Sequence, residues 1–495
     1  MRQTRSHGLV RARPHHVSRV VPGDLPRWQD ILPKARHVEH PGPERHSIYL
    51  DTDDRDLRHW DSVLRYRNPG PDDEPGWELA VPGGTLGTEL HLASPDSDLV
   101  PDELTAAVAG LTGGRPLRRS VTLGIGEHRH EWYDRKDRLL AQIIVETVQA
   151  TVIGRAATVE QWHQLHLDLG TAATKKHRTA VTAALARAGA APAPHRSELE
   201  HALAATDPAP GPHTPTGKAP TARRMLGAYL DAQIEAIGAG DVWLRRGLDP
   251  IHPTRVGIRR LRSTLRVWQD LFEPAQRTWL DSELSWYSGL LGHVRDRQVQ
   301  RARLAAALET LPPEVVMGPV ASRLDTDLLA DERRHLDEVL RALDSDRYRM
   351  LLAALARWRT QPPLTDHGDG ARVIEKAVRT AERTALSRVR AAAAGEDEAA
   401  PSRARKAAER ARYAVELAAP LLGRTRAKRK IARYTNIQQV LGEHRDSAVA
   451  TDLLREFGAR AGTTPGENGF TFGLLYGLEL QAAERARRHA ADLAT

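Results

Sequence analysis

Rows of arginine are the feature of this 495-residue sequence with the clearest chemistry, because guanidinium groups bind phosphate and carboxylate oxygens. If residues 252–266 form a helix, each residue turns about 100° around the helix axis. Five basic residues then fall within an arc of about 80° on one face of that helix. They are His252, Arg255, Arg259, Arg262 and Arg266. No carboxylate lies between residues 253 and 269, and each like-charge pair four apart costs a helix about 0.2 to 0.5 kcal/mol. We therefore expect an external anion to compensate this face.

A second basic row lies within residues 421–440, which contain no acidic residue. It comprises Arg426, Lys428, Arg429, Lys430 and Arg433. Neighbouring charges on such a helical row lie about 5 to 6 Å apart, so a linear polyanion can contact several in turn. The alternative is an ordinary solvated helix face.

The two rows belong to an internal repeat with a constant offset of 150 residues. Residues 252–262 align with 402–412, and the Leu-Gly-His-Val-Arg-Asp motif at 291–296 aligns with Leu-Gly-Glu-His-Arg-Asp at 441–446. The second copy contributes Arg405, Lys406, Arg410 and Arg412. We interpret each Arg-Asp pair as an ion pair at a helix start, and His444 as either a buried hydrogen-bonding residue or a ligand contact. The simplest explanation of the repeat is a duplicated helical bundle.

The elements that must position these residues differ between the two halves. The second half has long Ala-, Leu- and Arg-rich stretches with helical spacing, in which Ile258, Leu261 and Leu265 form an apolar stripe apart from the arginines. The first half favours short antiparallel strands separated by Gly, Pro and Asp. These strands are expected at 46–51, 62–67, 77–81, 89–92, 140–145 and 162–169. The predicted fold is α+β, with an N-terminal antiparallel β-barrel followed by duplicated four-helix bundles.

Domain boundaries follow from a Pro- and Gly-rich stretch. We predict a barrel domain at 1–206, a linker at 207–219 and a helical domain at 220–495, with repeats at about 220–365 and 370–495. Residues 1–219 carry 27 basic and 28 acidic side chains, whereas residues 220–495 carry 45 and 36. The basic excess therefore belongs to the helical domain, which favours anion binding there over a merely solvated face.

Composition narrows the other possibilities. The sequence has no Cys, which excludes disulfides, thiol nucleophiles and thiolate metal sites and fits a reducing compartment. No apolar run approaches the roughly 20 residues of a membrane-spanning helix, and no signal peptide is recognisable. We expect a cytoplasmic protein with no membrane contact.

The repeated motifs HPTRVGIRRLRSTLR, LLGHVRD, SRARKAAERARYAVE and VLGEHRD resemble the CHAD family, the conserved-histidine α-helical domain, across about 220–495. The resemblance implies two four-helix bundles around a basic surface that binds inorganic polyphosphate, and association with polyphosphate granules. The phosphate surface implied by similarity comprises His252, Arg255, Arg259, Arg260, Arg262, Arg266, Arg405, Lys406, Arg410 and Arg412. We add Arg426, Lys428, Arg429, Lys430, Arg433 and His444. The chain departs from the family at Ser402, usually His, and at Glu409, usually Lys, which puts affinity at the second repeat in doubt.

The first half resembles a CYTH domain, the tunnel-like barrel of triphosphate tunnel metalloenzymes, through IYLDTDDRDL, VLRYR, GWELAVP and WHQLHLDL. The family's ExExK strand has no counterpart at residues 15–19. Ala80 and Gly87 replace an expected Lys and Arg, and Gln164 and His166 replace a pair of Glu. Because Mg²⁺ and Mn²⁺ need hard oxygen ligands, we predict an inactive barrel and assign no catalytic residue, metal ligand or cofactor.

The leading hypothesis is therefore a polyphosphate-binding protein. A metal-dependent triphosphatase or polyphosphate hydrolase is the first alternative, and the missing carboxylates argue against it. Nucleic-acid binding is the second. It is disfavoured because the basic rows contain few aromatic residues for base stacking, with Tyr413 and Tyr434 the nearest.

Overall fold

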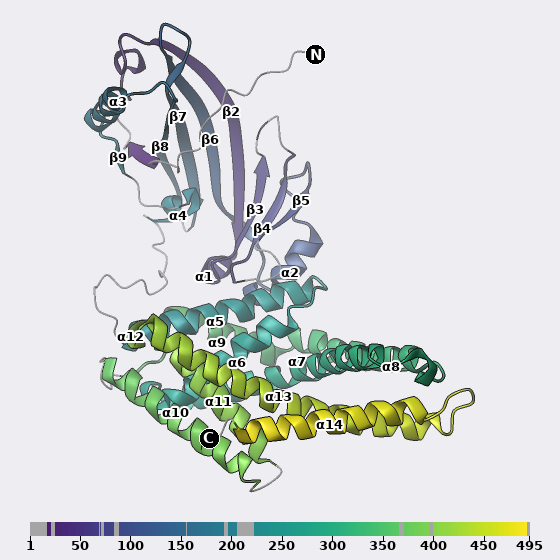
Figure 1. The fold of residues 1–495 in the computed structure, drawn as a ribbon. Helices are drawn as coiled ribbons and strands as arrows, with labels where there is room; N and C mark the ends of the chain where they lie inside the picture. The colour runs from purple at the N-terminus through teal and green to yellow at the C-terminus, as the bar shows by residue number, and fades with distance from the viewer. Residues whose placement is uncertain are drawn as a thin grey trace. The chain divides into compact units, whose positions relative to one another are not determined.

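The computed structural model describes residues 17–20, 25–68, 70, 74–83, 89–154, 156–192, 197–204, 222–365, 371–395 and 399–492. They form two compact units (Figure 1). The first contains nearly all described residues up to Ala204, and the second contains all those from Ala222 onwards. The predicted linker at 207–219 and the positions of His15, His16 and Gly87 lie outside the described residues.

The first unit is built on one sheet in which every pairing is antiparallel. Its strands are β1 (Val17–Val20), β2 (Arg36–Asp51), β3 (Val63–Asn68), β4 (Gly76–Ala80), β5 (Glu89–Ala93), β6 (Arg118–Tyr133), β7 (Leu139–Ile153), β8 (Ala157–Leu169) and β9 (Ala191–Pro192). The order across the sheet is β5-β4-β3-β2-β6-β7-β8-β1-β9. Short helices complete the unit: η1 (Trp28–Asp30), α1 (Asp56–His59), α3 (Lys175–Arg187) and α4 (Glu198–Leu203). Helix α2 (Asp102–Thr112) begins in this unit, and its residues from Ala107 onwards belong to the second.

The expected antiparallel strands are confirmed, but the expected barrel is not. Among the described residues, β5 and β9 are the two edges of the sheet and do not pair with each other. The edges are short, with five residues in β5 and two in β9, so neither offers the length of ladder that closure needs. The period-2 pattern of β8 is confirmed, since Leu165, Leu167 and Leu169 all belong to one apolar cluster with Trp132 and Ile143.

The described residues of the second unit from Ala222 onwards form helices and their connections, with one isolated bridge between Phe272 and Leu364. Its helices are α5 (Ala222–Arg245), α6 (Ile251–Val267), η2 (Gln269–Leu271), α7 (Pro274–Glu309), η3 (Pro313–Val315), α8 (Val320–Leu343), α9 (Asp346–Thr360), α10 (Ala371–Ala393), α11 (Ala400–Leu417), α12 (Ala419–Leu422), α13 (Arg424–Ala461) and α14 (Phe470–Asp492). The run α5, α6, α7, α8 recurs about 150 residues later as α10, α11, α13, α14. None of the described helices is long and apolar enough to cross a membrane.

The two repeats pack against each other rather than folding as isolated bundles. Figure 1 shows α7 with α8 and α13 with α14 as two long hairpins. One apolar cluster joins all four helices, with Leu304 of α7 and Leu328 of α8 meeting Leu454 of α13 and Phe472 of α14. Helices α6 and α11 are also in contact. The duplicated motifs are therefore brought face to face.

Candidate anion-binding site

Helix α6 presents an apolar face inwards and a basic face outwards, as the sequence predicts. Ile258, Leu261 and Leu265 are all fully buried, and the apolar face thereby fixes the rotation of the helix. The helix begins at Ile251, and the Thr254 hydroxyl donates a hydrogen bond to the Pro250 carbonyl oxygen over 2.8 Å. His252 consequently lies in the first turn, as expected.

A cleft of about 360 Å³ lies between the two repeats. Its walls come from α6, α7, α11 and α13, and they include six arginines and three carboxylates. The arginines are Arg255, Arg259, Arg295, Arg405, Arg412 and Arg445. The carboxylates are Asp296, Glu409 and Asp446, and His252 also lines the cleft. The arginines exceed the carboxylates by three, so the cleft carries a net positive charge that favours anions over cations.

Residues 150 positions apart meet in this cleft. Arg255 faces its repeat counterpart Arg405, and Arg295-Asp296 faces Arg445-Asp446. An Arg445 guanidinium nitrogen lies 2.9 Å from an Asp296 oxygen, so the two repeats are joined by an ion pair at the cleft. The internal repeat thus builds one site from two copies.

Glu409 is the exception to this symmetry, because its counterpart in the first repeat is Arg259. Its carboxylate lies 3.6 Å from Arg259 Nε and 3.8 Å from an Arg405 nitrogen. The residue that departs from the family pattern therefore lowers the positive charge of the cleft directly.

Burial disfavours the charged forms of several basic side chains in the cleft. It lowers the pKa of Arg255, an effect that Asp296 opposes and that the neighbouring Arg259, Arg445 and Arg295 reinforce. Burial also lowers the pKa of Arg405, and Glu409 opposes that shift. The pKa of His252 is lowered by burial and then by Arg295, Arg259 and Arg255. An anion in the cleft would reverse each of these shifts, because it favours the charged forms.

Hydrogen-bonding capacity in the cleft is also unused. The Nε atoms of Arg255, Arg259, Arg405 and Arg412 are buried and have no hydrogen-bond partner among the described residues. Arg255 Nη1 donates to the Gly292 carbonyl oxygen over 3.3 Å, which holds the side chain across the start of the cleft. Unpaired buried donors cost stability, so an acceptor supplied by a ligand is favourable here.

Five of the predicted site residues line the cleft, and the rest lie elsewhere. Arg262 and Arg266 both pair with Asp281 of α7, each over 2.9 Å. Arg260 pairs with Glu416 over 3.2 Å. The expectation that the α6 row is unneutralised is wrong, because Asp281 of α7 pairs with Arg262 and Arg266. Arg255 and Arg259 also each lie within 4 Å of a carboxylate, Asp296 and Glu409 respectively. These positions tie helices together.

The remaining predicted site residues lie in two other pockets or outside any of these pockets. Arg410 and Arg266 line a separate pocket beside α10. Lys430 and Arg433 line a recess with α10, where Lys430 pairs with Glu382. Lys406, Arg426, Lys428 and Arg429 are exposed, and His444 does not line the cleft. The row on α13 and the α6 row are therefore not one surface.

Arg295 and Arg445 line the cleft, although neither was predicted from the sequence to bind phosphate. The Arg-Asp pairs at 295–296 and 445–446 were interpreted as helix starts, but they lie well inside α7 and α13, which run for 36 and 38 residues. Gly292 precedes the first pair within α7 without ending the helix, and a Cβ atom there would lie 3.5 Å from Arg255 Nη2, an ordinary van der Waals distance. The signal that could have identified Arg295 and Arg445 was their recurrence at the repeat offset.

In the described part of the sheet unit, the charged groups that were candidates for a site are paired with one another. Arg65 pairs with Glu78 over 2.6 Å, and Arg67 lies 3.5 Å from the same carboxylate. Glu146 pairs with Arg45 and accepts from His166, whose Nε2 is 3.1 Å away. Within the described ranges, no group of three or more His, Cys, Asp or Glu could hold a metal ion. The carboxylates that a metal would need are already paired with basic groups.

Comparison with known proteins covers both units. The sequence model of the CHAD domain matches residues 228–455. Two uncharacterised proteins from two strains of Mycobacterium tuberculosis are each 30% identical over 482 residues, which is 93% of this chain and 91% of theirs. The crystal structure of the CHAD domain from the plant Ricinus communis is 25% identical and covers 54% of this chain and 90% of its own, with a TM-score of 0.43.

Proposed function

Because this chain is a member of the CHAD family, we propose that it binds inorganic polyphosphate in the cleft between its two repeats. Binding is electrostatic and involves no covalent step. The phosphate oxygens accept hydrogen bonds from guanidinium groups of both repeats, chiefly Arg255 and Arg405, with His252 at the start of α6.

One observation carries this proposal: the cleft gathers six arginines against three carboxylates in a partly buried setting. The lowered pKa values of Arg255 and Arg405 indicate that the protein alone disfavours their charged forms. A ligand with one negative charge on each repeating unit removes this penalty at several positions at once. Arginine forks also match the geometry of adjacent phosphate oxygens.

The lining of the cleft favours polyphosphate over a nucleic acid. Apart from the His252 ring, none of the described residues that line it is aromatic. Proteins that hold single strands without reading their sequence usually stack the bases on aromatic side chains, and such platforms are missing here. We therefore expect polyphosphate to displace a single-stranded DNA oligonucleotide from the protein at far lower phosphate concentration than the reverse exchange requires.

Titration of the full chain with long-chain polyphosphate by calorimetry, at several salt concentrations, tests the proposal. We expect submicromolar binding at low salt that weakens steadily as salt rises, because bound cations are released from the polymer. The Arg255→Ala and Arg405→Ala variants should each weaken binding by about tenfold or more, since each removes a charge-assisted contact. Arg390→Gln, at an exposed position of α10 outside the cleft, is the matched control. Absence of binding at low salt would reject the proposal.

A further inference from the structure

A second pocket, of about 410 Å³, lies between α10 and the end of α6. One wall is the stretch from Arg266 through η2, and the other is the face of α10 that carries Val373, Ala377 and Ala381. Residues four apart share one face of a helix, so these three apolar side chains form a row along the pocket, beside a polar row of Lys376, Thr380 and Thr384. Its volume falls in the range of small-molecule sites, and its lining is mainly apolar.

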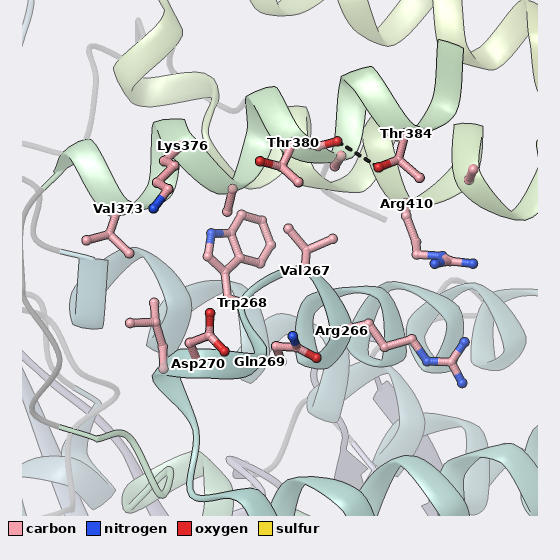
Figure 2. Close-up of a pocket in the computed structure, with 14 residues that line it drawn as sticks. Arg266, Val267, Trp268, Gln269, Asp270, Val373, Lys376, Thr380, Thr384 and Arg410 are labelled. Atoms are coloured by element: carbon pink, nitrogen blue, oxygen red, sulfur yellow. Dashed lines mark hydrogen bonds between the residues drawn. The ribbon is translucent and has the colours of Figure 1, made fainter. Parts of the chain in front are cut away.

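Trp268 stands in the middle of this pocket. Figure 2 shows its indole rising between the two helices, with Lys376 and Val373 on one side and Arg266 and Arg410 on the other. The side chain is only 2% exposed, and its Nε1 atom has no hydrogen-bond partner among the described residues. A buried N–H group without an acceptor is unusual for a tryptophan. The Trp268 N–H group could therefore donate a hydrogen bond to a ligand in the pocket.

Positive charge is concentrated at the end of the pocket near Arg410. Its Nε donates to the Lys406 carbonyl oxygen over 3.2 Å, and no carboxylate pairs with it within the described part of the chain. The neighbouring Arg266 is already held by Asp281. Burial lowers the pKa of Arg410, and the nearby Arg266 and Arg388 lower it further, whereas the Glu409 and Asp281 carboxylates oppose the shift. Arg410 is thus a half-buried cation that has no ion-pair partner among the described residues, although two carboxylates lie near enough to act on it.

The pocket is not a second copy of the inter-repeat cleft. None of its lining residues lines that cleft. The repeat counterpart of Trp268 is Ala418, so the second repeat does not carry the same indole. The chemistry also differs, because the cleft is lined mainly by charged and amide groups whereas this pocket has an apolar floor.

We propose that this pocket binds a small organic anion, whose apolar body lies against Trp268, Val373 and Ala377 and whose phosphate, sulfonate or carboxylate group is held by Arg410. The apolar body distinguishes this ligand from inorganic polyphosphate, and the proposal does not depend on binding in the cleft. A ring system of one or two rings fits the volume. The anionic group supplies Arg410 with the ion-pair partner that it lacks among the described residues.

The experiment measures binding of the fluorescent probe 1-naphthyl phosphate to the full chain. Two comparison ligands each carry one part of the probe: 1-naphthol has only the apolar rings, and inorganic phosphate has only the anionic group. We expect saturable binding of 1-naphthyl phosphate that is at least about tenfold tighter than that of either comparison ligand, because only the whole probe uses both the floor and the arginine. Saturating long-chain polyphosphate should leave this affinity unchanged within about twofold, since the two sites share no lining residue. Equal affinity for 1-naphthol, or full displacement by polyphosphate, would overturn the proposal.

Two pairs of variants locate the site. Ala381→Phe fills the pocket and should weaken the probe by about tenfold or more, whereas Ser387→Phe, at an exposed position on the same helix outside the pocket, should leave it unchanged. Arg410→Gln should weaken the probe to the affinity of 1-naphthol, while Arg390→Gln should not. Arg410→Gln leaves the apolar floor intact, so it keeps the test decisive even where Ala381→Phe fails to fold. Undiminished binding to Arg410→Gln contradicts the assignment.

Discussion

Glu409 is the residue that most directly limits the charge of the cleft. It lies within 4 Å of both Arg259 and Arg405, and the first repeat has arginine at the equivalent position. A carboxylate that attracts these two arginines also repels an incoming phosphate. The departure from the family pattern seen in the sequence therefore has a specific structural consequence.

We predict that Glu409→Gln tightens polyphosphate binding. The change removes one negative charge from the cleft, and partial screening by solvent reduces the gain to roughly three- to tenfold in the dissociation constant. Calorimetric titration of the full chain at one fixed salt concentration measures it. Asp281→Asn is the matched control, because it also neutralises a carboxylate that pairs with two arginines, but outside the cleft. An equal gain in both variants would show that only the overall charge matters.

His252 gives binding a dependence on pH. Burial and three neighbouring arginines lower its pKa below the ordinary 6.5, so its imidazole is neutral in the free protein at pH 7. A bound phosphate chain favours the imidazolium and raises this pKa, so binding takes up a proton as the pH falls. We predict that affinity increases between about pH 7 and pH 5 and that His252→Gln removes part of this increase. Titrations across that range in both proteins check it, and an identical pH profile would exclude His252 from the site.

At the scale of helices, the arginines have two different roles. Some form ion pairs between neighbouring helices, and others line the cleft. Arg262 and Arg266 join α6 to α7 through Asp281, whereas Arg405 of α11 faces its counterpart across the cleft. A helical wheel cannot separate these roles, because it shows only the acids on the same helix. The absence of acids from 253–269 was read correctly from the sequence, but Asp281 lies on the next helix.

The sequence nevertheless predicted much of the helical unit. The 150-residue offset correctly paired α6 with α11 and α7 with α13, because a duplicated apolar stripe forces the same rotation on both copies. The sequence did not reveal that Arg295 and Arg445 line the cleft, since that depends on how α7 and α13 cross.

We predict opposite effects for two arginine truncations. Arg262→Ala should lower the free energy of unfolding by about 1 to 2 kcal/mol, because it breaks a partly buried charge-assisted hydrogen bond, and it should change polyphosphate affinity by less than about twofold. Arg405→Ala should weaken binding by about tenfold while leaving stability nearly unchanged, since the folded protein already disfavours its charge. Thermal unfolding measures the stability of both variants, and titration measures their affinity for polyphosphate. If Arg262→Ala lost affinity and Arg405→Ala lost stability, Arg262 would be the binding residue and Arg405 the structural one.

At the scale of the whole chain, the two units hold their charges differently. The helical unit leaves a net positive cleft, whereas the basic groups on the sheet are paired, Arg65 and Arg67 with Glu78 and Arg45 with Glu146. Several strands of the sheet were predictable from their alternation, but the central β6 was not among those expected, and β2, β7 and β8 extend well beyond the expected segments. The open edges of the sheet were not predictable, because closure depends on strand length and curvature rather than on local pattern.

The sheet unit leads to the last prediction, that the full chain releases no phosphate from tripolyphosphate in the presence of Mg²⁺ or Mn²⁺. A divalent metal needs several hard oxygen ligands free to coordinate it and to bridge to the substrate. Glu146 is held by Arg45 and His166, and Glu78 by Arg65, so a metal would first have to displace these partners. A colorimetric phosphate assay of the full chain against a protein-free blank measures release, with Glu146→Gln as the internal control. Metal-dependent release that disappears in Glu146→Gln would show that the sheet unit is a hydrolase, and that the chain does more than bind.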